Sequence, residues 1–461
     1  MMSELLATYH SQIKEVSEMS SLNNGLVIET APSGKAIGDI KVPGDKSCSH
    51  RSIMFGALAD GTTHVKGFLP GQDCIATMNA FKAMGVEIHG PDKENNVTIV
   101  GRGIDGLSAP KDNIDIGNSG TSIRLLSGIL AGQTFASSMS GDVSLNKRPM
   151  GRVVKPLQLM GANINAAEDG TPPVECHGLQ QGQKLKAIDY TLPMASAQVK
   201  SCILLAGMYA EGVTTVTEPG ITRDHTERML NAFGYPVNVD GNRVSIEGGK
   251  RLTACDFEVP GDISSATFFM VAGLIAKEGN LTIRNVGMNP TRIGAINILK
   301  QMNGDLTVIN ERMAGGEPVA DIVVKSSQLK GIDIDPADVP LAIDEFPAIF
   351  VAAACAQGTT RLREAEELRV KESDRIQAMA DGLTELGIEC TVYEDGIDII
   401  GGEMKSGTIN SHHDHRIAMS FAIGSLRASG VITILDCDNV ATSFPNFVTL
   451  ANHVGLSLAT R

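Results

Sequence analysis

The sequence repeats one short pattern six times: an apolar helix end, a Gly or Asn, and then alternating apolar residues. The six segments read FKAMGVEI, LQLMGANI, LNAFGYPV, LKQMNGDL, LTELGIEC and ANHVGLSL. Their Gly or Asn residues stand at positions 85, 161, 234, 303, 387 and 455, so the steps are 76, 73, 69, 84 and 68 residues. Gly and Asn enter the left-handed conformation at the lowest cost, so each segment predicts a helix end that leads into a strand. The near-regular step predicts one supersecondary unit built six times.

A second half of the unit also repeats. An Ala-rich apolar run ends at a Gly, and Thr, Val and Ile then alternate, with the stops at Gly61, Gly132, Gly212, Gly279, Gly358 and Gly430. Each unit therefore reads helix, strand, loop, helix, strand, with short additional strands such as Val97–Val100. Taken alone, such an α/β array is also compatible with a scaffold that carries no chemistry.

The four residues Val-Pro-Gly-Asp occur twice, at 42–45 and 259–262, and they predict where the chain changes lobe. We expect residues 44–260 to hold repeats 1–3, and residues 26–43 with 261–461 to hold repeats 4–6. The strand Ala36–Val42 then belongs to the second lobe. Residues 1–25 read as an N-terminal extension ahead of a first strand-like run, Gly25–Ile28. A cleft between two similar lobes is a natural ligand site.

Composition excludes several classes of partner. The net charge of −14 argues against nucleic acid, whose phosphates demand a basic surface. No uncharged apolar stretch is long enough to span a membrane, and the N-terminus lacks an apolar signal core. The eight Cys residues form no CxxC pair, which is typical of free thiols in a reducing compartment. We expect a cytoplasmic protein with full aliphatic cores.

Basic residues gather at predicted helix starts although the chain is acidic. In GDKSCSHR, Lys46, Ser47 and Arg51 fall in the opening turns of an expected helix. Backbone N–H groups and the positive end of the helix dipole suit an anion there. Ordinary capping by Ser47 or Ser49 explains the same residues without a ligand. This segment alone leaves both interpretations open.

Comparable charged or small polar segments recur along the chain, namely GNSGTSIR (117–124), KRPMGR (147–152), SAQVK (196–200), RDHTER (223–228), DEFP (344–347) and RVKESDR (369–375). Each alone is compatible with a loop or a solvated helix face. SAQVK is expected to present a hydroxyl, an amide and a cation, Lys200, at its helix start. The alternating charges of RVKESDR are typical of a preorganised acid/base and anion site. Together the segments predict more than one anionic group bound between the lobes.

The segment HHDHR (412–416) raises a metal alternative, because three His and one Asp are zinc-ligand types. Adjacent residues rarely converge on one ion, and Arg416 fits the other cations at helix starts better. The chain also lacks a GxxxxGK[ST] loop, a strand–GxGxxG–helix fingerprint and a GxSxG elbow. We therefore expect an anion site without a metal.

In order and spacing, these segments resemble the 5-enolpyruvylshikimate-3-phosphate synthase family from about Gly34 to Gly455. The matching motifs are GDKSCSHRS, GNSGTSIR, KRPMGR, RVKESDR, DHRIAM and ATSFP. GDKS, SAQVK, RDHTE and NPTR further resemble its class II branch. The resemblance implies a two-lobed, inside-out α/β fold with three βαβαββ units per lobe. It implies transfer of the enolpyruvyl group of phosphoenolpyruvate to the 5-hydroxyl of shikimate 3-phosphate with release of phosphate, by an enzyme expected to need no cofactor and to be a monomer.

The resemblance also implies residue roles. The shikimate 3-phosphate contacts are expected at Lys46, Ser47, Arg51, Ser196, Ala197, Gln198, Arg223 and Lys371. The phosphoenolpyruvate site is expected at Gly120, Arg148, Arg375 and Arg416, with Lys46 reaching both ligands. Asp344 matches the general base, and Glu372 matches the acid at the methylene carbon, a duty that Lys46 can share.

Two departures and two rivals accompany this interpretation. Thr442 stands where some members carry a Lys, and Gly120 stands where some glyphosate-insensitive members carry Ala. The nearest rival is UDP-N-acetylglucosamine enolpyruvyl transferase, which usually carries a Cys that is missing from Asp142–Lys147. A non-enzymatic repeat scaffold is the other rival, and it has no need of the carboxylates and cations at the helix starts.

Overall fold

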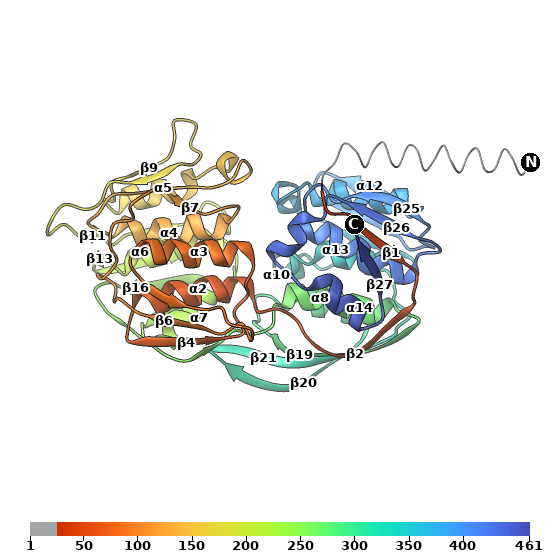
Figure 1. Ribbon diagram of the computed structural model, residues 1–461. Helices are drawn as coiled ribbons and strands as arrows, with labels where there is room; N and C mark the ends of the chain where they lie inside the picture. Colours follow the sequence, from red (N-terminus) through yellow and green to blue (C-terminus); the bar gives the residue numbers. More distant parts are fainter. Residues whose placement is uncertain (1–24) are drawn as a thin grey trace, which may run out of the picture.

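A computed structural model describes residues 25–461, and Figure 1 shows two lobes side by side. The expected extension, residues 1–25, lies outside the described residues except for Gly25. Two separate hydrophobic clusters fill the lobes. One runs from Cys48 to Val259, and the other combines Ile28–Val42 with Ile263–Leu458. These clusters support the proposed division into residues 44–260 and residues 26–43 with 261–461.

The first lobe contains three four-stranded sheets, each with two helices. The first unit has β18 (Phe257–Glu258), β4 (Thr62–Lys66), β6 (Val97–Val100) and β5 (Glu87–His89), with α2 (Lys46–Leu58) and α3 (Gln72–Ala83). The second has β7 (Ile114–Asp115), β8 (Ser137–Ser140), β10 (Val174–Cys176) and β9 (Ile164–Asn165), with α4 (Gly120–Ala131) and α5 (Gly151–Leu159). The third has β12 (Asp189–Thr191), β14 (Val213–Thr217), β16 (Arg243–Glu247) and β15 (Val237–Asp240), with α6 (Ala197–Gly207) and α7 (His225–Ala232). Two minor pairs are β3 (Ala59–Asp60) with β17 (Leu252–Thr253), and β11 (Leu185–Lys186) with β13 (Ala210–Glu211).

The second lobe repeats this plan. The fourth unit has β2 (Lys35–Lys41), β19 (Glu278–Gly287), β21 (Glu317–Lys325) and β20 (Asp305–Ala314), with α8 (Ile263–Ile275) and α9 (Gly294–Gln301). The fifth has β22 (Thr359–Leu362), β24 (Gly396–Ile400) and β23 (Glu389–Tyr393), with α11 (Phe346–Ala354) and α12 (Arg375–Glu385). The sixth has β25 (Gly407–Asn410), β26 (Ile432–Leu435), β1 (Ile28–Ala31) and β27 (Ser457–Thr460), with α13 (His415–Gly424) and α14 (Phe447–His453). Short helices are α10 (Val339–Ala342), η1 (Leu145–Lys147), η2 (Pro336–Asp338), η3 (Glu366–Val370), η4 (Ser425–Arg427) and η5 (Asp438–Thr442).

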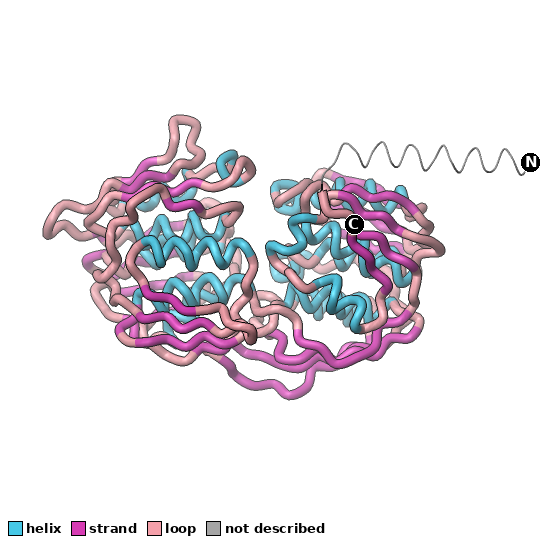
Figure 2. Tube along the Cα trace, viewed as in Figure 1, coloured by secondary structure: helices cyan, strands magenta, loops and turns pink. Residues whose placement is uncertain are grey.

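These sheets confirm the predicted βαβαββ unit. In every four-stranded sheet the first strand pairs in parallel with the second, and the remaining pairings are antiparallel. The fifth sheet lacks a first strand, and two isolated parallel bridges stand in its place, Lys330 with Gln357 and Asp333 with Arg361. Figure 2 shows helices gathered inside each lobe with strands around them, and every residue of α8 is buried. The fold is therefore inside-out, with helices forming the cores.

The six helix ends adopt the predicted conformation. Gly85, Gly161, Gly234, Gly387 and Gly455 all have positive φ, and Asn303 has a φ of 68°. The second set of glycines is mixed, since Gly61, Gly212 and Gly358 have positive φ whereas Gly132, Gly279 and Gly430 do not. Gly132 instead permits close packing, because a Cβ there would lie 2.2 Å from the Tyr209 ring.

The two Val-Pro-Gly-Asp segments cross the junction side by side. The Asp45 N–H donates to the Pro260 carbonyl at 2.7 Å, and the Asp262 N–H donates to the Pro43 carbonyl at 2.9 Å. The side chain of Asp45 caps α2 through the Cys48 N–H, and that of Asp262 caps α8 through the Ser264 N–H. β2 joins the second lobe by pairing with β19, one residue earlier than the expected Ala36–Val42.

The predicted bounds of the first strand are wrong. The first strand runs over Ile28–Ala31 and not Gly25–Ile28, because its ladder partners in β26 and β27 begin at Ile28. None of the helices within residues 25–461 is long and apolar enough to cross a bilayer.

Candidate active site

A carboxylate surrounded by cations marks the place where the lobes meet. Asp344 follows α10, and its side chain forms an ion pair with Arg223, which precedes α7 in the other lobe. From its own lobe, the Lys371 Nζ lies 3.7 Å from Asp344 Oδ1, and the Arg375 Nη1 lies 3.4 Å from the same oxygen. The Arg416 Nη1 donates to the Asp344 carbonyl at 2.8 Å. Sequence segments that are far apart therefore converge on one carboxylate.

The electrostatic consequence is a strongly acidic carboxyl. Burial by itself would raise the pKa of Asp344, but the positive charges of Arg223, Lys371 and Arg416 outweigh burial and hold this pKa well below its usual value. The side chain is 15% exposed, so it reaches solvent and is not sealed in a core. In this state Asp344 is ionised but a weak base.

The neighbouring segment, residues 369–375, forms a second ion-pair group. Arg375, the first residue of α12, donates to Glu372 at 2.6 Å and to Asp414, the N-cap of α13, at 2.8 Å. Burial would raise the pKa of Glu372, but nearby positive charge, that of Arg375 above all, outweighs burial and lowers it. Burial keeps His415 neutral by lowering its pKa to about 4. Glu372 is therefore a carboxylate in this state.

Lys46 is the first residue of α2 and pairs with Asp73. Burial would lower the pKa of Lys46, but Asp73 raises it above its ordinary value, so the side chain is an ammonium at neutral pH. Ser47 is half-buried beside it. Arg51 is buried beneath this turn, where it donates to Thr226 at 2.7 Å. It also donates to Ser201 at 3.1 Å and to the Ser47 carbonyl at 3.0 Å. Most of its donors are thus already engaged by the protein.

The first lobe holds a group of guanidiniums that lack carboxylate partners. Among the described residues no carboxylate lies within ion-pair distance of Arg124, Arg148 or Arg152. Burial and repulsion by Arg148 and Arg152 lower the pKa of Arg124 to about 10. Arg148 donates only to a neutral amide, that of Asn118, at 2.6 Å. Concentrated positive charge of this kind is suited to an anionic ligand.

Gly120 and the start of α6 lie against these guanidiniums. A Cβ at Gly120, the first residue of α4, would stand 2.9 Å from the Arg148 Nη1 and 3.1 Å from the Arg124 Nη1. The Gln198 amide accepts from Arg124 and donates to the Thr121 hydroxyl at 3.0 Å. Ser196 caps α6 through the Val199 N–H, and Ala197 opens that helix. The structure thus brings Gly120, Arg148 and the 196–198 segment together.

One expectation is wrong. Lys200 does not present a cation at the start of α6, because its side chain is buried and its Nζ lies 2.7 Å from both Glu218 and Glu227.

The histidines of 412–415 do not assemble a metal site, because Asp414 is used by Arg375 and the α13 cap. Thr442 supplies no cation, and its hydroxyl donates to the Asn439 carbonyl at 2.7 Å.

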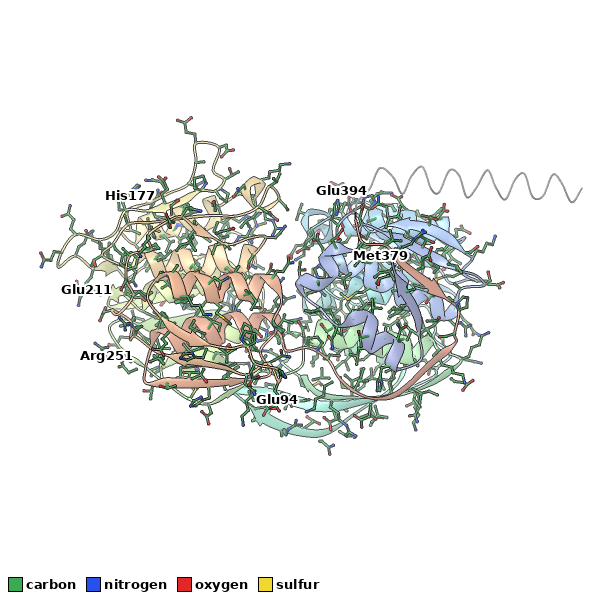
Figure 3. All side chains as sticks on the ribbon, viewed as in Figure 1. Glu94, His177, Glu211, Arg251, Met379 and Glu394 are labelled. Carbon is green, nitrogen blue, oxygen red and sulfur yellow. The ribbon has the colours of Figure 1, made fainter. Side chains whose placement is uncertain are left out.

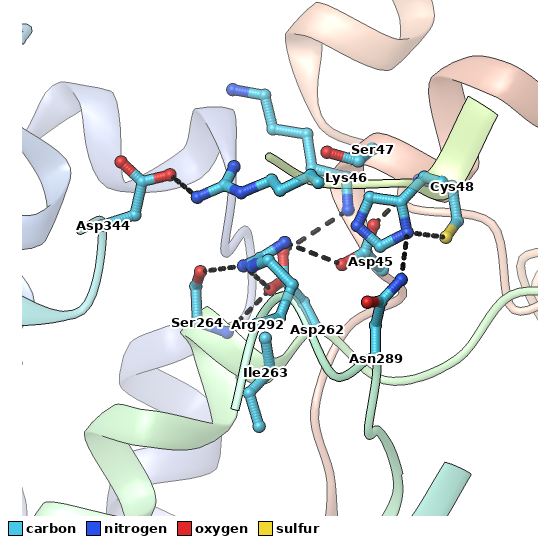
Figure 4. Close-up of polar contacts among 12 residues, drawn as sticks. Asp45, Lys46, Ser47, Cys48, Asp262, Ile263, Ser264, Asn289, Arg292 and Asp344 are labelled. Atoms are coloured by element: carbon cyan, nitrogen blue, oxygen red, sulfur yellow. Dashed lines mark hydrogen bonds and ion pairs between the residues drawn. The ribbon is translucent and has the colours of Figure 1, made fainter. Parts of the chain in front are cut away.

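Sequence reasoning missed three contributors. Arg124 was visible in GNSGTSIR but was not assigned a role. Asp73, the partner of Lys46, lies in a segment with no motif, so no sequence signal marked it. Arg292, the last residue of NPTR, had no assigned role; it links the two crossings at 3.5 Å from Asp45 and 3.7 Å from Asp262, and Figure 4 shows it beside both aspartates. By contrast, the labelled Glu211 and Arg251 lie on the outer side of the first lobe in Figure 3, where charges are exposed.

Comparisons with known proteins agree over nearly the whole chain. A sequence model of the family EPSP synthase (3-phosphoshikimate 1-carboxyvinyltransferase) matches residues 31–450. A 3-phosphoshikimate 1-carboxyvinyltransferase from Methylococcus capsulatus is 58% identical over 433 residues, which cover 94% of this chain and 98% of that protein. One from Hydrogenovibrio crunogenus is also 58% identical, covering 95% of this chain and 99% of that protein.

Solved structures show the same likeness. EPSP synthase from Acinetobacter baumannii superposes with a TM-score of 0.88 at 59% identity, covering 95% of this chain and 100% of that one. The enolpyruvyl transferase NikO from Streptomyces tendae has a TM-score of 0.77 at 16% identity, covering 95% of this chain and 99% of that one, and so shares the fold. The chain therefore belongs to the EPSP synthase (3-phosphoshikimate 1-carboxyvinyltransferase) family.

Proposed function

We propose that this chain transfers the enolpyruvyl group of phosphoenolpyruvate to the 5-hydroxyl of shikimate 3-phosphate and releases phosphate. The observation that carries the proposal is the ionised Asp344, placed among cations that anionic substrates can engage. A carboxylate suits removal of the hydroxyl proton, and the cations suit the charge of the substrates and of the tetrahedral intermediate. Both elements are needed by this chemistry, and a repeat scaffold needs neither.

The cleft divides into two proposed subsites. Gly120, Arg148, Arg375 and Arg416 bind phosphoenolpyruvate, and we add Arg124 because it lies beside Gly120 and, among the described residues, has no carboxylate partner. Shikimate 3-phosphate contacts Lys46, Ser47, Arg51, Ser196, Ala197, Gln198, Arg223 and Lys371. Because Arg51 is already engaged by Thr226 and Ser201, its role is mainly to hold the α2 turn in place.

Arg223 couples substrate binding to the base. If the phosphate of shikimate 3-phosphate recruits Arg223, that guanidinium leaves Asp344. Arg223 is the strongest of the cations that lower the pKa of Asp344, so its departure raises this pKa toward a value better suited to accepting a proton. The substrate would thereby strengthen the base that deprotonates it.

Proton delivery to the methylene carbon is proposed to begin from Lys46. Its pKa is raised and that of Glu372 is lowered, so in this state Lys46 carries a proton and Glu372 does not. Lys46 lies close enough for its charge to lower the pKa of Glu372. Glu372 can then accept a proton and pass it on once the ligands have changed its surroundings.

The proposal extends to the assembly, the cofactor need, the lobe motion and the inhibitor of the enzyme. We infer that the enzyme works as a cytoplasmic monomer, without a cofactor, and that its lobes close over the substrates. Glyphosate, which carries a carboxylate and a phosphonate, is proposed to compete for the phosphoenolpyruvate subsite around Gly120.

The test is phosphate release from phosphoenolpyruvate by the purified full-length chain. Release should require shikimate 3-phosphate, and Arg223→Gln should raise the KM for that substrate more than the KM for phosphoenolpyruvate. Release that proceeds with UDP-N-acetylglucosamine in its place would transfer the assignment to the rival enzyme. If calorimetry detects binding of neither substrate, the non-enzymatic repeat scaffold would be favoured.

A further inference from the structure

Three buried side chains at the junction are not used by the proposed reaction. Cys48 lies in the first turn of α2, His225 begins α7, and Glu317 begins β21. Their exposed fractions are 0%, 3% and 1%. The Cys48 Sγ lies 3.7 Å from the His225 Nδ1, and the same nitrogen lies 2.7 Å from the Glu317 Oε1. A sulfur, a nitrogen and an oxygen therefore converge within 4.8 Å of one another.

Neighbouring groups fix the orientation of this cluster. The Asn289 Nδ2 donates to the second oxygen of Glu317 at 3.0 Å, which leaves Oε1 directed at the imidazole. The Asn289 amide oxygen accepts from the Thr291 N–H at 2.9 Å, so the amide cannot turn without losing that bond. The Asn289 Nδ2 also lies 3.5 Å from the His225 Nδ1, and Figure 4 draws dashed lines from Cys48 and Asn289 to this ring nitrogen. Partners that hold ligand side chains in this way are typical of metal sites.

We propose that Cys48, His225 and Glu317 bind one divalent cation of the zinc class at the seam between the lobes. Thiolate, imidazole and carboxylate are the three ligand types that zinc takes in proteins, whereas calcium and magnesium demand oxygen ligands. We assign the fourth position to a water, since among residues 25–461 no fourth His, Cys, Asp or Glu side chain joins this group.

The spacing suits tetrahedral zinc after a small adjustment. Zinc bond lengths imply a sulfur–nitrogen separation of about 3.6 Å and a nitrogen–oxygen separation of about 3.4 Å. The observed sulfur–nitrogen distance of 3.7 Å already fits. The nitrogen–oxygen distance of 2.7 Å is that of a hydrogen bond, and it lengthens when the ion replaces the shared proton.

The charges balance in the occupied site. Burial, Asp45 and Glu317 raise the pKa of the Cys48 thiol, so without an ion the sulfur is protonated. An ion of charge +2 compensates one thiolate and one carboxylate; its binding releases the thiol proton and moves the ring proton that Nδ1 of His225 shares with Glu317 to Nε2, so the imidazole stays neutral. The bound cluster is therefore neutral although it is buried.

The site joins both lobes. Cys48 and His225 lie in the first lobe, and Glu317 lies in β21 of the second lobe. A bound ion would hold the two lobes at the spacing of this structure. We expect it to slow any lobe movement, and this consequence, unlike the binding itself, rests on the proposed function.

Cobalt(II) titration of the tag-free full-length chain tests the proposal, because a cobalt–thiolate bond gives a charge-transfer absorption in the near ultraviolet. We expect that absorption to saturate at one ion per chain and to be lost on addition of zinc. Cys48→Ser should abolish it and weaken zinc binding at least ~100-fold, more than loss of an outer partner costs. Cys202→Ser is the matched control, since Cys202 is also fully buried but lies outside the cluster, and it should leave the absorption unchanged.

Glu317→Gln should retain the thiolate absorption but weaken zinc binding, which separates loss of one ligand from loss of the site. X-ray absorption of the zinc-loaded wild-type chain needs no variant, and should show one sulfur neighbour. No thiolate–cobalt absorption in the wild-type chain, absorption that survives Cys48→Ser, or zinc without a sulfur neighbour would each overturn the proposal. Phosphate release without zinc binding would overturn only the metal site, and zinc binding without phosphate release only the proposed reaction.

Discussion

Asp344→Asn separates catalysis from binding at this site. The amide keeps the size of the carboxylate and can still accept a hydrogen bond from Arg223, but it cannot take a proton. Loss of a general base costs about 10²- to 10⁴-fold in rate, which corresponds to about 2.7 to 5.4 kcal/mol of activation free energy. We expect kcat to fall within this range.

Binding of an anionic substrate to Asp344→Asn should become tighter even though kcat falls. The Asp344 carboxylate lies 3.7 Å from the Lys371 Nζ and 3.4 Å from the Arg375 Nη1. At an effective dielectric constant of 20, each such pair attracts by about 4.5 to 5 kcal/mol before the cost of lost hydration. Hydration cancels most of this attraction. If only ~1 kcal/mol remains, the freed cations lower the KM of an anionic substrate about fivefold.

Steady-state phosphate release at varied concentrations of both substrates gives kcat and both KM values, and calorimetry gives the binding constants. Asp321→Asn is the control, because Asp321 also pairs with an arginine, at 3.0 Å from Arg284, but lies away from the site. A kcat for Asp344→Asn within tenfold of the wild-type value would refute Asp344 as the base. Equal losses in the two variants would point to a general structural effect.

Three further perturbations follow from the same structure. Gly161→Ala should lower the free energy of unfolding, measured by urea titration, by about 1–2 kcal/mol because Gly161 has a φ of 86°. Gly220→Ala is the control, since Gly220 is equally free of close neighbours but lacks a positive φ, and it should change this free energy by less than ~0.5 kcal/mol. Gly120→Ala should raise the KM for phosphoenolpyruvate roughly 5- to 30-fold by displacing Arg148 from a charged hydrogen bond of about 1–2 kcal/mol, and an unchanged KM would place that substrate elsewhere. Burial lowers the pKa of His50 from 6.5 to about 3, so as the pH falls the unfolded chain takes up this proton before the folded one does. The contribution of neutral His50 to the free energy of unfolding is therefore complete above pH 6.5. It is lost by up to about 1.4 kcal/mol per pH unit as the pH falls toward 3. His50→Gln should flatten this loss, and parallel pH curves for the two proteins would refute the buried neutral state of His50.

Local chemistry explains why much of the fold was predictable. A helix end at Gly or Asn is determined by one residue's backbone, so Gly161 and Asn303 could be identified from their own sequence surroundings. The crossing segments at 42–45 and 259–262 were predictable because they repeat. The start of the first strand was misplaced because strand limits depend on distant ladder partners, here in β26 and β27.

The site was predictable as a set of charged positions but not as a set of pairs. Arg223 and Asp344 are 121 residues apart and lie in different lobes, so no local pattern indicates that they form an ion pair. Lys200 was misassigned for the same reason, because its partners Glu218 and Glu227 come from other segments. The cluster of Cys48, His225 and Glu317 likewise arises only from folding.

The fate of one oxygen atom tests the central claim most directly. If the 5-hydroxyl of shikimate 3-phosphate attacks the central carbon of phosphoenolpyruvate, the bond that breaks joins that carbon to the bridging oxygen. Phosphoenolpyruvate labelled with ¹⁸O in the bridge should therefore yield labelled phosphate, only when shikimate 3-phosphate is present, together with shikimate 3-phosphate enlarged by one enolpyruvyl group in the mass spectrum. Unlabelled phosphate, or labelled phosphate released without the second substrate, would contradict the account.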